Sequence, residues 1–308
     1  MDLFAAMRIF VRVTDKMSFS AAADELDISS SSVSKQIAQL EQRVGAKLLQ
    51  RTTRRLSLTE VGEAYYQQCL AVLREVDESD NLVSQLQGAP RGTLKINANM
   101  TFGQLLLSRA VNEFMAEHGE LSVDITLDDR MPDLVRDGFD LAIRIAEPEL
   151  PNSSLVARQI AAIPLYIVAS RDYLQRQGRP ASAAQLLEHN CLVFVHASNA
   201  DLWRVERQGG VETVRVSGDL RANNSLVARE AVVAGRGIAS LAYFVIEQQV
   251  LSGQLERVFA DAQPEVLSVF AIYPDRRYLS PKVSVFIEFL QQWLGEQLNR
   301  RWPSVGGH

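Results

Sequence analysis

One apolar repeat between residues 58 and 86 divides the chain into two unequal parts. Thr59 is a good N-cap, and the glycines and proline within Gln87–Gly92 stop the pattern. We therefore expect one long helix over residues 59–87. Its apolar members recur mostly at spacings of four and three, which is typical of a heptad seam: Leu58, Val61, Tyr65, Cys69, Val72, Val76, Ser79, Val83 and Leu86.

A helix of this length beside a small domain favours pairing with a second copy of the chain. Packing of the helix against its own domain is the alternative. On the seam, we interpret Cys69 as a small apolar side chain rather than a redox sensor.

Length and composition indicate an ordinary protein of two domains. The chain of 308 residues exceeds one typical core. No apolar run is long enough to span a membrane, and Asp2, Arg8 and Arg12 interrupt the N-terminal apolar residues, unlike a secretory signal. The only two cysteines, Cys69 and Cys191, lie far apart, so we expect free thiols and a cytoplasmic location.

The net charge of −5 hides an asymmetry along the chain. Residues 1–60 contain nine lysines and arginines against seven acidic residues, so this part carries +2 and the remainder −7. Six of the cations lie between Lys35 and Arg55, where Glu41 is the only acidic residue. Such a basic patch on an acidic protein favours one polyanion-binding region, with a solvated charged face as the alternative.

The first sixty residues fit three amphipathic helices. The first has apolar residues at helical spacing from Leu3 to Val11. The second is capped by Ser18, and its inner face is Phe19, Ala22, Ala23 and Leu26.

The serine run before Lys35 belongs to a third helix rather than to a flexible linker. Ser29 is its N-cap, and an apolar stripe follows at spacings of four, three and four: Val33, Ile37, Leu40 and Val44. The opposite face is small, polar and cationic: Ser31, Ser34, Lys35, Ala38 and Gln42. Two short helices joined by a tight turn, the second with such a face, indicate a helix-turn-helix whose second helix enters the major groove of double-stranded DNA.

The stretch LLQRTTRRLSLTEVG predicts a β-hairpin wing with a cationic tip, which suits the phosphate backbone or the minor groove. We expect salt-dependent binding, because phosphate contacts release counterions. We assign base-edge contacts to Ser31, Ser34 and Lys35 and phosphate contacts to Ser18, Thr52, Arg54 and Arg55; Ser30 and Arg51 complete the predicted DNA-binding set.

The segment SFSAAADELDISSSSVSKQIAQLEQRVGAKLLQRTTRRLSLTEVG resembles the N-terminal winged helix-turn-helix of LysR-type transcriptional regulators. The likeness runs without a gap from Asp2 to Gly62, and RTTRRLSLTEVG resembles a large subgroup. Asp27 replaces a usual glycine, Ser30 a usual glutamine or arginine, and Lys35 a usual arginine. Glutamine can make two hydrogen bonds with one adenine, whereas serine makes only one. The resemblance therefore does not imply which operator sequence this chain binds.

This resemblance implies several partners. They are a pseudo-palindromic operator, a second copy of the chain joined through an antiparallel pair of linker helices, further copies in a homotetramer, a small-molecule effector, and RNA polymerase.

Residues 93–300 alternate strands and helices, which predicts an α/β architecture with mainly parallel sheets. Strands are expected at 93–98, 121–127, 139–145, 164–170, 190–195, 211–217, 237–242 and 266–274, and helices at 105–115, 132–138, 226–235 and 282–298.

The stretches GFDLAIRI, NSSLVARQIAAIPLYIVASRDYLQRQGRP, HNCLVF and AVVAGRGIASLAYFVI resemble the effector-binding domain of the same family. The implied fold is a winged helix-turn-helix over 1–60, a dimerisation linker helix over 59–87, a hinge over 88–92, and a two-lobed α/β domain of periplasmic-binding-protein type over 93–300. Lobe one would comprise 93–163 and 268–298, and lobe two 164–267, with crossings near Ala162–Leu165 and Leu267–Phe270.

An effector would lie between the lobes. Hydroxyl and amide groups after the first strand suit an anionic or carbonyl group, and Phe102 and Trp203 suggest an aromatic component or, equally, core packing. Helix capping is the alternative role for residues 223–225, and an ion pair for Arg144. The predicted effector-binding residues are Asn99, Met100, Thr101, Phe102, Arg144, His196, Ser198, Asn223, Asn224 and Ser225.

Two other classes of function compete with a regulator. A solute-binding protein fits residues 93–298 alone, but the first sixty residues and the N-terminal charges argue against it. An enzyme is disfavoured because no GxSxG or Walker loop occurs and the histidines lack metal-ligand spacing, so we expect neither metal nor cofactor: His118, His189, His196 and His308.

Overall fold

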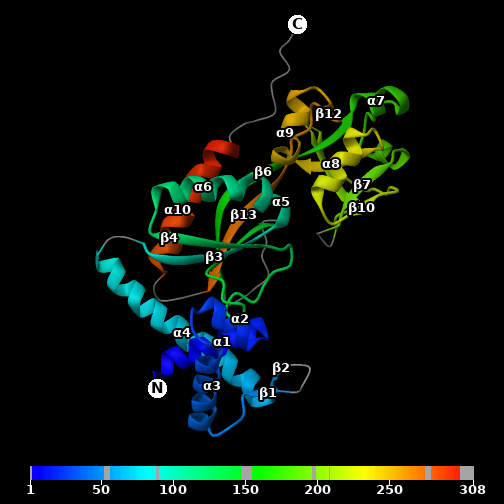
Figure 1. Cartoon of the computed structure of the whole chain (residues 1–308). Coiled ribbons are helices and arrows are strands. Elements are labelled where there is room, and N and C mark those ends of the chain that lie inside the picture. Colours follow the sequence, from blue (N-terminus) through cyan, green and yellow to red (C-terminus); the bar gives the residue numbers. More distant parts are fainter. Residues whose placement is uncertain are drawn as a thin grey trace. The chain divides into compact units, whose positions relative to one another are not determined.

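The computed structural model of the chain describes residues 2–51, 56–87, 90–146, 155–195, 199–207, 209–274 and 279–298. The chain divides into two compact units, which meet in sequence at Arg91 and Gly92. Figure 1 shows the first unit as helices with one short hairpin, and the second as a mixture of helices and strands.

The first unit contains three short helices, a hairpin and a long helix. Asp2, Ser18 and Ser29 are the N-caps of the first three helices, and each side chain accepts a hydrogen bond from a backbone amide of the first turn. The caps predicted at Ser18 and Ser29 are therefore confirmed. The elements are α1 (Leu3–Lys16), α2 (Phe19–Glu25), α3 (Ser30–Val44), β1 (Leu49–Arg51), β2 (Leu56–Leu58) and α4 (Glu60–Gln87).

The apolar faces of these helices meet in one core. Val33, Ile37 and Leu40 of α3 are buried there, which confirms the predicted stripe. Ala22 and Ala23 of α2 are buried beside them, and their small side chains let the neighbouring helices approach closely. The core thus fixes α3 with its opposite, polar face on the surface.

The first half of α4 packs in part against its own unit, so the packing within one chain that was the alternative interpretation is present here, while pairing with a second copy stays a prediction. Cys69 and Leu73 are buried in the core that α1 also lines, and Tyr65 lies at its edge with its ring centroid 5.9 Å from that of Phe10. Val61, a predicted seam member, is 51% exposed. At this end of α4 one part of the repeat is buried within its own unit, whereas Val61 and Val72 stay exposed. The side chains of residues 77–87 lie outside the description.

Two long strands join the two lobes of the second unit (Figure 1). β6 (Leu155–Ser170) and β13 (Glu265–Pro274) pair antiparallel, with Glu265 opposite Leu165. β13 also pairs with β5 (Leu141–Ala146) in lobe one, whereas the far end of β6 pairs with β11 (Ile238–Ala242) in lobe two. Both strands therefore belong to both lobes.

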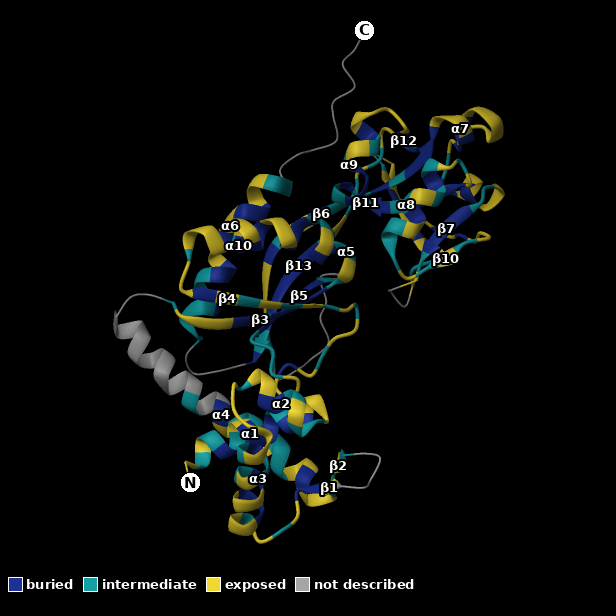
Figure 2. Ribbon diagram, viewed as in Figure 1, coloured by how far each residue is buried: buried dark blue, intermediate teal, exposed yellow. Residues whose placement is uncertain are grey.

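Lobe one has the strand order β4-β3-β5-β13-β6. β3 (Gly92–Ala98) runs parallel to β4 (Leu121–Leu127) and to β5. The helices α6 (Ser108–Glu117) and α10 (Pro281–Leu298) cover one face, where the rings of Phe114 and Phe286 pack edge to face with centroids 5.0 Å apart. Figure 2 shows buried residues concentrated along the strands of this sheet.

Between β3 and α6 the chain forms α5 (Met100–Phe102) and a π-helical turn, η1 (Gly103–Leu107). The helix predicted at residues 105–115 is present but begins earlier, at Met100. Gly103 allows a close approach to β4, because a Cβ at this position would lie 2.2 Å from Cδ2 of Leu127.

Lobe two has the strand order β10-β7-β11-β6, with β12 also paired to β6. Helices α8 and α9 cover one face, and α7, η2 and the β8–β9 hairpin cover the other. The elements are α7 (Arg171–Gln177), η2 (Ala184–Glu188), β7 (Cys191–Phe194), β8 (Leu202–Arg207), β9 (Gly210–Arg215), β10 (Arg221–Ala222), α8 (Ser225–Val233), α9 (Tyr243–Leu251) and β12 (Leu255–Arg257).

The α/β class is confirmed, but the prediction of mainly parallel sheets is wrong. β6 and β13 pair antiparallel with each other and with β11 and β5, because strands that run between lobes enter both sheets. Residues 134–138 form turns in place of the helix predicted at 132–138. Only five residues separate Pro132 from Gly138 (φ +73°), which is little more than one helical turn. No helix within the described ranges is long and apolar enough to cross a membrane.

Candidate functional site

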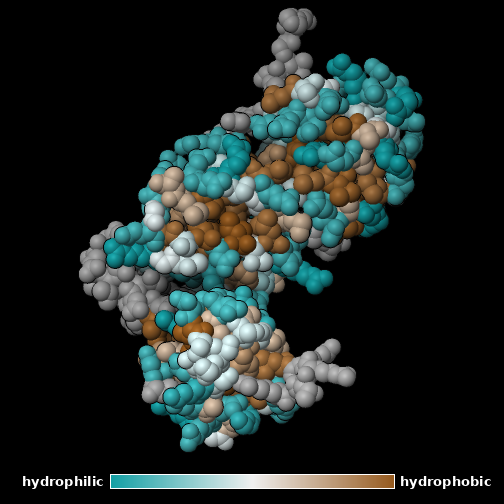
Figure 3. All heavy atoms as spheres, viewed as in Figure 1, coloured by the Kyte–Doolittle hydropathy of each residue, from teal (hydrophilic) through white to brown (hydrophobic). Residues whose placement is uncertain are grey.

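The polar face of α3 lies opposite its buried stripe. Ser30, Ser31 and Lys35 are exposed, and Ser34 is half-buried. The surface around α2 and α3 is largely of intermediate to hydrophilic character (Figure 3). The predicted reading residues therefore share one accessible side of one helix, as major-groove contact requires.

The serines at the start of α3 form a hydrogen-bond cluster. Ser29 Oγ accepts a hydrogen bond from the Ser32 amide at 3.2 Å and donates one to Ser32 Oγ at 3.0 Å. The Oγ atoms of Ser29 and Ser31 lie 2.9 Å apart. Ser29 is thus occupied by capping, whereas the exposed Ser31 keeps hydrogen-bonding capacity for a partner.

The turn between α2 and α3 places Asp27 in the left-handed region, at φ +52°. The Ile28 amide then donates to the Ala23 carbonyl at 3.1 Å, which reverses the chain before α3. Glycine adopts this backbone conformation without strain, and aspartate is one of the few other residues that tolerate it. This explains in physical terms why a glycine is usual where this chain has Asp27.

Ser18 is a half-buried cap rather than a free hydroxyl. Its Oγ accepts from the Ala21 amide at 3.2 Å and lies 3.1 Å from Ser20 Oγ. A phosphate at this position would meet the N-terminus of α2 as well as the hydroxyl.

The predicted wing is present as the antiparallel pair β1–β2, with Arg51 opposite Leu56. Thr59 fixes its base: Oγ1 donates to the Lys47 carbonyl at 2.7 Å and accepts from the Gly62 amide at 2.8 Å. The predicted contact residues Thr52, Arg54 and Arg55 lie outside the described ranges.

In the second unit, predicted effector residues of the two lobes meet directly. Ser225 Oγ, at the start of α8, donates to Thr101 Oγ1 in α5 at 3.2 Å. Asn224 Nδ2 lies 3.7 Å from Met100 Sδ, while its Oδ1 accepts from the Leu226 amide at 2.9 Å and so caps α8. The cap predicted as the alternative role is therefore present, and the same residues also join the lobes.

Asn99 connects the ends of β3 and β5. Its Oδ1 accepts from the Ile145 amide at 2.9 Å, and its Nδ2 donates to Asp129 Oδ1 at 3.1 Å. The same Asp129 oxygen accepts from the Met100 amide at 3.0 Å, so it holds the start of α5. Asp129 was not among the predicted site residues, because it lies in a loop without a motif.

Arg144 is 6% exposed and is held within lobe one. Its guanidinium donates to the carbonyls of Ile143 and Arg130, both at 2.8 Å, and to the side chain of Asn97. Burial lowers the pKa of Arg144 to about 10, although Asp129 and Asp128 oppose this shift. Nε has no hydrogen-bond partner among the described residues. These carbonyl contacts hold the side chain in lobe one, and its contact with an effector stays a prediction.

The remaining predicted effector residues include buried, exposed and undescribed positions. Phe102 is 1% exposed and its ring packs edge to face with Phe244, so it belongs to the core, as does the buried Trp203. Asn223 is exposed. His196 and Ser198 lie outside the described ranges.

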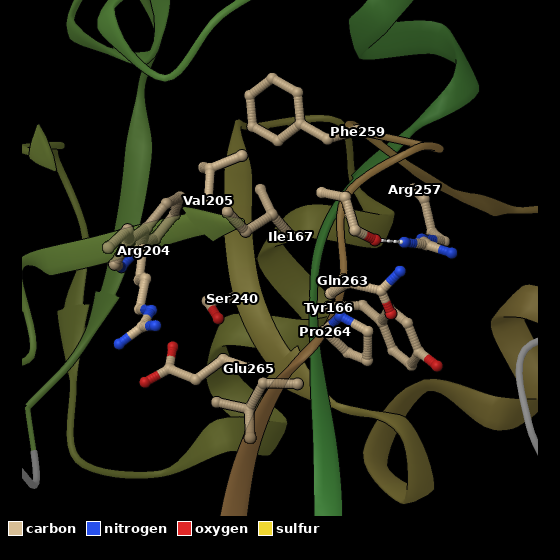
Figure 4. A pocket seen from close by; sticks show the side chains of 13 residues that line it. Tyr166, Ile167, Arg204, Val205, Ser240, Arg257, Phe259, Gln263, Pro264 and Glu265 are labelled. Atoms are coloured by element: carbon tan, nitrogen blue, oxygen red, sulfur yellow. Dashed lines mark hydrogen bonds between the residues drawn. The ribbon is translucent and has the colours of Figure 1, made fainter. Parts of the chain in front are cut away.

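A small hollow lies in lobe two beneath the β8–β9 hairpin (Figure 4). Figure 4 shows Arg204 and Glu265 on one side of it and Tyr166 and Arg257 on the other, where the Arg257 guanidinium lies 4.9 Å from the Tyr166 ring centroid. Its interior of about 20 Å³ has room for about one water molecule and is too small for an effector.

The two cysteines are buried and are not joined by a disulfide. Burial raises the pKa of Cys69 to about 11 and that of Cys191 to about 12, so both thiols stay protonated near neutral pH and are poor nucleophiles. Within the described ranges no cluster of side chains could hold a metal ion.

Both parts of the chain match family models. Residues 4–63 match a model described as "Bacterial regulatory helix-turn-helix protein, lysR family", and residues 87–295 match one described as "LysR substrate binding domain".

Several known proteins resemble nearly the whole chain. An uncharacterised HTH-type transcriptional regulator of Haemophilus influenzae is 34% identical over 92% of this chain and 98% of its own length. The HTH-type transcriptional regulator DmlR of Escherichia coli is 32% identical over 96% of both chains. The solved structure of CrgA, a LysR-type transcriptional regulator from Neisseria meningitidis, is 28% identical, covers 94% of this chain and 98% of its own, and has a TM-score of 0.60.

Proposed function

The chain belongs to the LysR family of bacterial transcriptional regulators, and we propose that it binds a pseudo-palindromic operator under the control of a small molecule held between its lobes. The family consists of DNA-binding regulators rather than enzymes, so no reaction is assigned to the chain. A cytoplasmic location is part of the proposal, because the chain acts on DNA.

The DNA contacts proposed for α3 are direct base contacts. Ser31 and Lys35, exposed on one side of the helix, reach base edges, and Ser30 and Ser34 flank them. The wing supplies phosphate contacts through Arg51, Thr52, Arg54 and Arg55, and Ser18 adds one at α2. Phosphate contacts position the protein and base contacts select the sequence.

Pairing of two chains is proposed to place two copies of α3 on two half-sites. The linker helix over residues 59–87 is the segment proposed to pair, and the exposed seam residues Val61 and Val72 support this. A dimer with twofold symmetry reads a pseudo-palindrome, and a tetramer reads two such sites. Contact with RNA polymerase beside the operator completes the proposal. The proposed domain boundaries are 1–60 for the winged helix-turn-helix, 59–87 for the linker helix, 88–92 for the hinge and 93–300 for the effector-binding domain.

The observation that carries the effector proposal is the direct bond between Ser225 and Thr101. Two hydroxyls from different lobes face each other at the starts of α5 and α8. A carboxylate or carbonyl group of an effector, including an aromatic acid, would accept hydrogen bonds from both lobes at once. Such a ligand shifts the balance between lobe arrangements by its differential affinity for them.

The test has two parts. The full chain is screened by thermal shift against carboxylates, aldehydes and aromatic acids, and the active compounds are added to gel-shift assays with DNA upstream of its own gene. The proposal expects a stabilising compound that also changes the DNA complex. Thermal stabilisation that Thr101→Val and Ser225→Ala leave unchanged would place the ligand elsewhere.

A further inference from the structure

Glu41 is the only acidic side chain that is buried in the described part of the chain. It lies in α3 and is 8% exposed, although it belongs to the most cationic stretch of the sequence. A buried carboxylate requires hydrogen-bond partners, since its desolvation is costly.

Those partners all come from the base of the wing. Oε1 of Glu41 accepts from the amides of Leu48 and Leu49, at 3.0 and 3.2 Å, and Oε2 accepts from Lys47 Nζ at 2.6 Å. Leu49 is the first residue of β1. Three consecutive residues that lead into the wing are thus bound to one side chain of the recognition helix. Hydrogen bonds to a carboxylate are stronger than those between neutral groups.

The protonation state of Glu41 agrees with this arrangement. Burial by itself would raise its pKa, but the hydrogen bonds from Lys47, Leu49 and Leu48 outweigh burial and hold the pKa below its usual value. The carboxylate is therefore charged at neutral pH.

The same segment is held from its other side by Thr59, the residue that precedes α4. Thr59 Oγ1 donates to the Lys47 carbonyl, and the Thr59 amide donates to the Leu48 carbonyl at 3.0 Å. Glu41 therefore binds the amide side of the segment and Thr59 the carbonyl side. Glu41 and Thr59 together therefore fix the angle between α3 and the wing.

We propose that Glu41 is a positioning residue for DNA recognition, which holds the wing at the angle where wing and α3 contact the duplex together. This inference rests on the proposed function. Glu41 itself need not touch DNA, because its oxygens are occupied by Lys47, Leu48 and Leu49.

Charge and geometry predict opposite effects of Glu41→Gln, which makes the inference testable. Loss of one negative charge alone would tighten binding to DNA. Glutamine, however, presents an NH₂ group to Lys47 and loses the charge-assisted bonds, so the wing is released. The matched control is Glu25→Gln, which removes one acidic side chain of the same unit that pairs with Lys16 at 2.9 Å.

The measurement is the affinity of the full chain for a labelled duplex of random sequence over a range of salt concentrations. We expect Glu41→Gln to weaken binding about ten-fold at moderate salt and to reduce the slope of log K against log salt by about one for every phosphate that the released wing no longer neutralises. Glu25→Gln should bind at least as tightly as the unaltered chain, with the same slope. Faster hydrogen exchange at the Leu48 and Leu49 amides should accompany the change in Glu41→Gln.

A second variant guards against a folding defect. Thr59→Val removes the side-chain bond on the carbonyl side of the segment and should produce the same reduction of slope; it carries the test if Glu41→Gln does not fold. Variants that fold and keep the affinity and slope of the unaltered chain overturn the positioning role. Failure of the unaltered chain to bind any duplex would instead overturn the proposed function.

Discussion

Ser225 Oγ donates a hydrogen bond of 3.2 Å to Thr101 Oγ1, and this bond joins helix α8 of lobe two to helix α5 of lobe one. Each hydroxyl stands at the start of a helix, so the two lobes meet through residues suited to bind polar groups. Any ligand that enters between these residues must break the bond or bridge it.

The bond predicts a measurable coupling between the lobes. Thr101→Val and Ser225→Ala should each lower the free energy of unfolding by about 1 kcal/mol, and the double variant should lose less than the sum of both. The coupling energy is measured by urea unfolding, monitored through the fluorescence of Trp203 and Trp293, which lie one in each lobe. Asn223→Ala, at an exposed neighbour, is the control. Strictly additive losses would mean that the two hydroxyls do not interact in solution.

Lys35→Ala should remove sequence selectivity while leaving general DNA affinity nearly intact. Removal of a base contact costs about 1–3 kcal/mol on the cognate site only, whereas binding to random DNA depends on the sum of phosphate contacts. Competition gel shifts with cognate and random duplexes measure the ratio of the two affinities, which is the sequence selectivity. Lys16→Ala removes a lysine from α1, away from the reading face, and should leave the ratio unchanged. An unaltered preference in Lys35→Ala would exclude this lysine from base contact.

The two non-glycine residues with positive φ among those described provide a stability test. Met17, at φ +47°, and Asp27, at φ +52°, both carry a steric cost in the left-handed region. Met17→Gly and Asp27→Gly should each raise the free energy of unfolding by up to about 1 kcal/mol, with the larger gain at Met17, since aspartate tolerates this region better.

Gly45→Ala is the converse variant. Its φ is +74° and nothing lies within 4 Å of the added Cβ, so only backbone strain opposes it. We expect a loss of about 1 kcal/mol. Thermal or denaturant unfolding of the full chain measures the stability of all three variants: Met17→Gly, Asp27→Gly and Gly45→Ala. A higher free energy of unfolding in Gly45→Ala would show that the turn adopts another conformation in solution.

Gly62→Ala should damage the wing base. A Cβ at this position would lie 1.9 Å from the Leu48 carbonyl oxygen, a backbone atom that moves only with β1. We expect a loss of about 2 kcal/mol or more together with weaker DNA binding, measured by unfolding and by fluorescence anisotropy. Gly119→Ala, in open space, should change neither. Unaltered DNA binding in Gly62→Ala would show that α4 moves without disturbing the wing.

His189 predicts a pH dependence of stability. Burial lowers its pKa below the usual 6.5, although Glu188 opposes this, and Tyr173 Oη lies 3.1 Å from its Nδ1. Because the folded state holds the proton less tightly than the unfolded state, the stabilisation is present above pH 6.5 and is lost as the pH falls through the folded pKa. Melting temperatures between pH 8 and pH 5 should fall further for the unaltered chain than for His189→Gln. If the melting temperatures of both proteins fell equally with pH, His189 would not be the source of the pH dependence.

The local structure of the first sixty residues could be predicted from the sequence because short-range rules determine it. Ser18 and Ser29 cap helices by contacts within three residues, and the stripe from Val33 to Leu40 repeats at the helical period. The wing followed from alternation around Leu56 and Leu58. These features depend on neighbours along the chain, so a pattern is sufficient to find them.

Other features depend on which distant surface a side chain meets. The repeat that contains Cys69 predicts an apolar stripe on α4, but period alone does not tell whether the partner is α1 or a second chain. Glu41 accepts hydrogen bonds from the amides of Leu48 and Leu49, and Asp129 from the amide of Met100, and no residue pattern predicts such contacts. The carbonyls of Ile143 and Arg130 that hold Arg144 could not be predicted from the sequence either.

The path of β6 and β13 has a consequence for the order in which the protein is synthesised. The chain leaves lobe one along β6, builds all of lobe two, and only then returns along β13 and α10. On the ribosome, β5 therefore emerges with one edge unpaired, and that edge stays open until the whole of lobe two has been translated. Lobe one, although it begins first, is the last part of the molecule to complete its sheet, and the nascent chain carries an aggregation-prone edge for that interval.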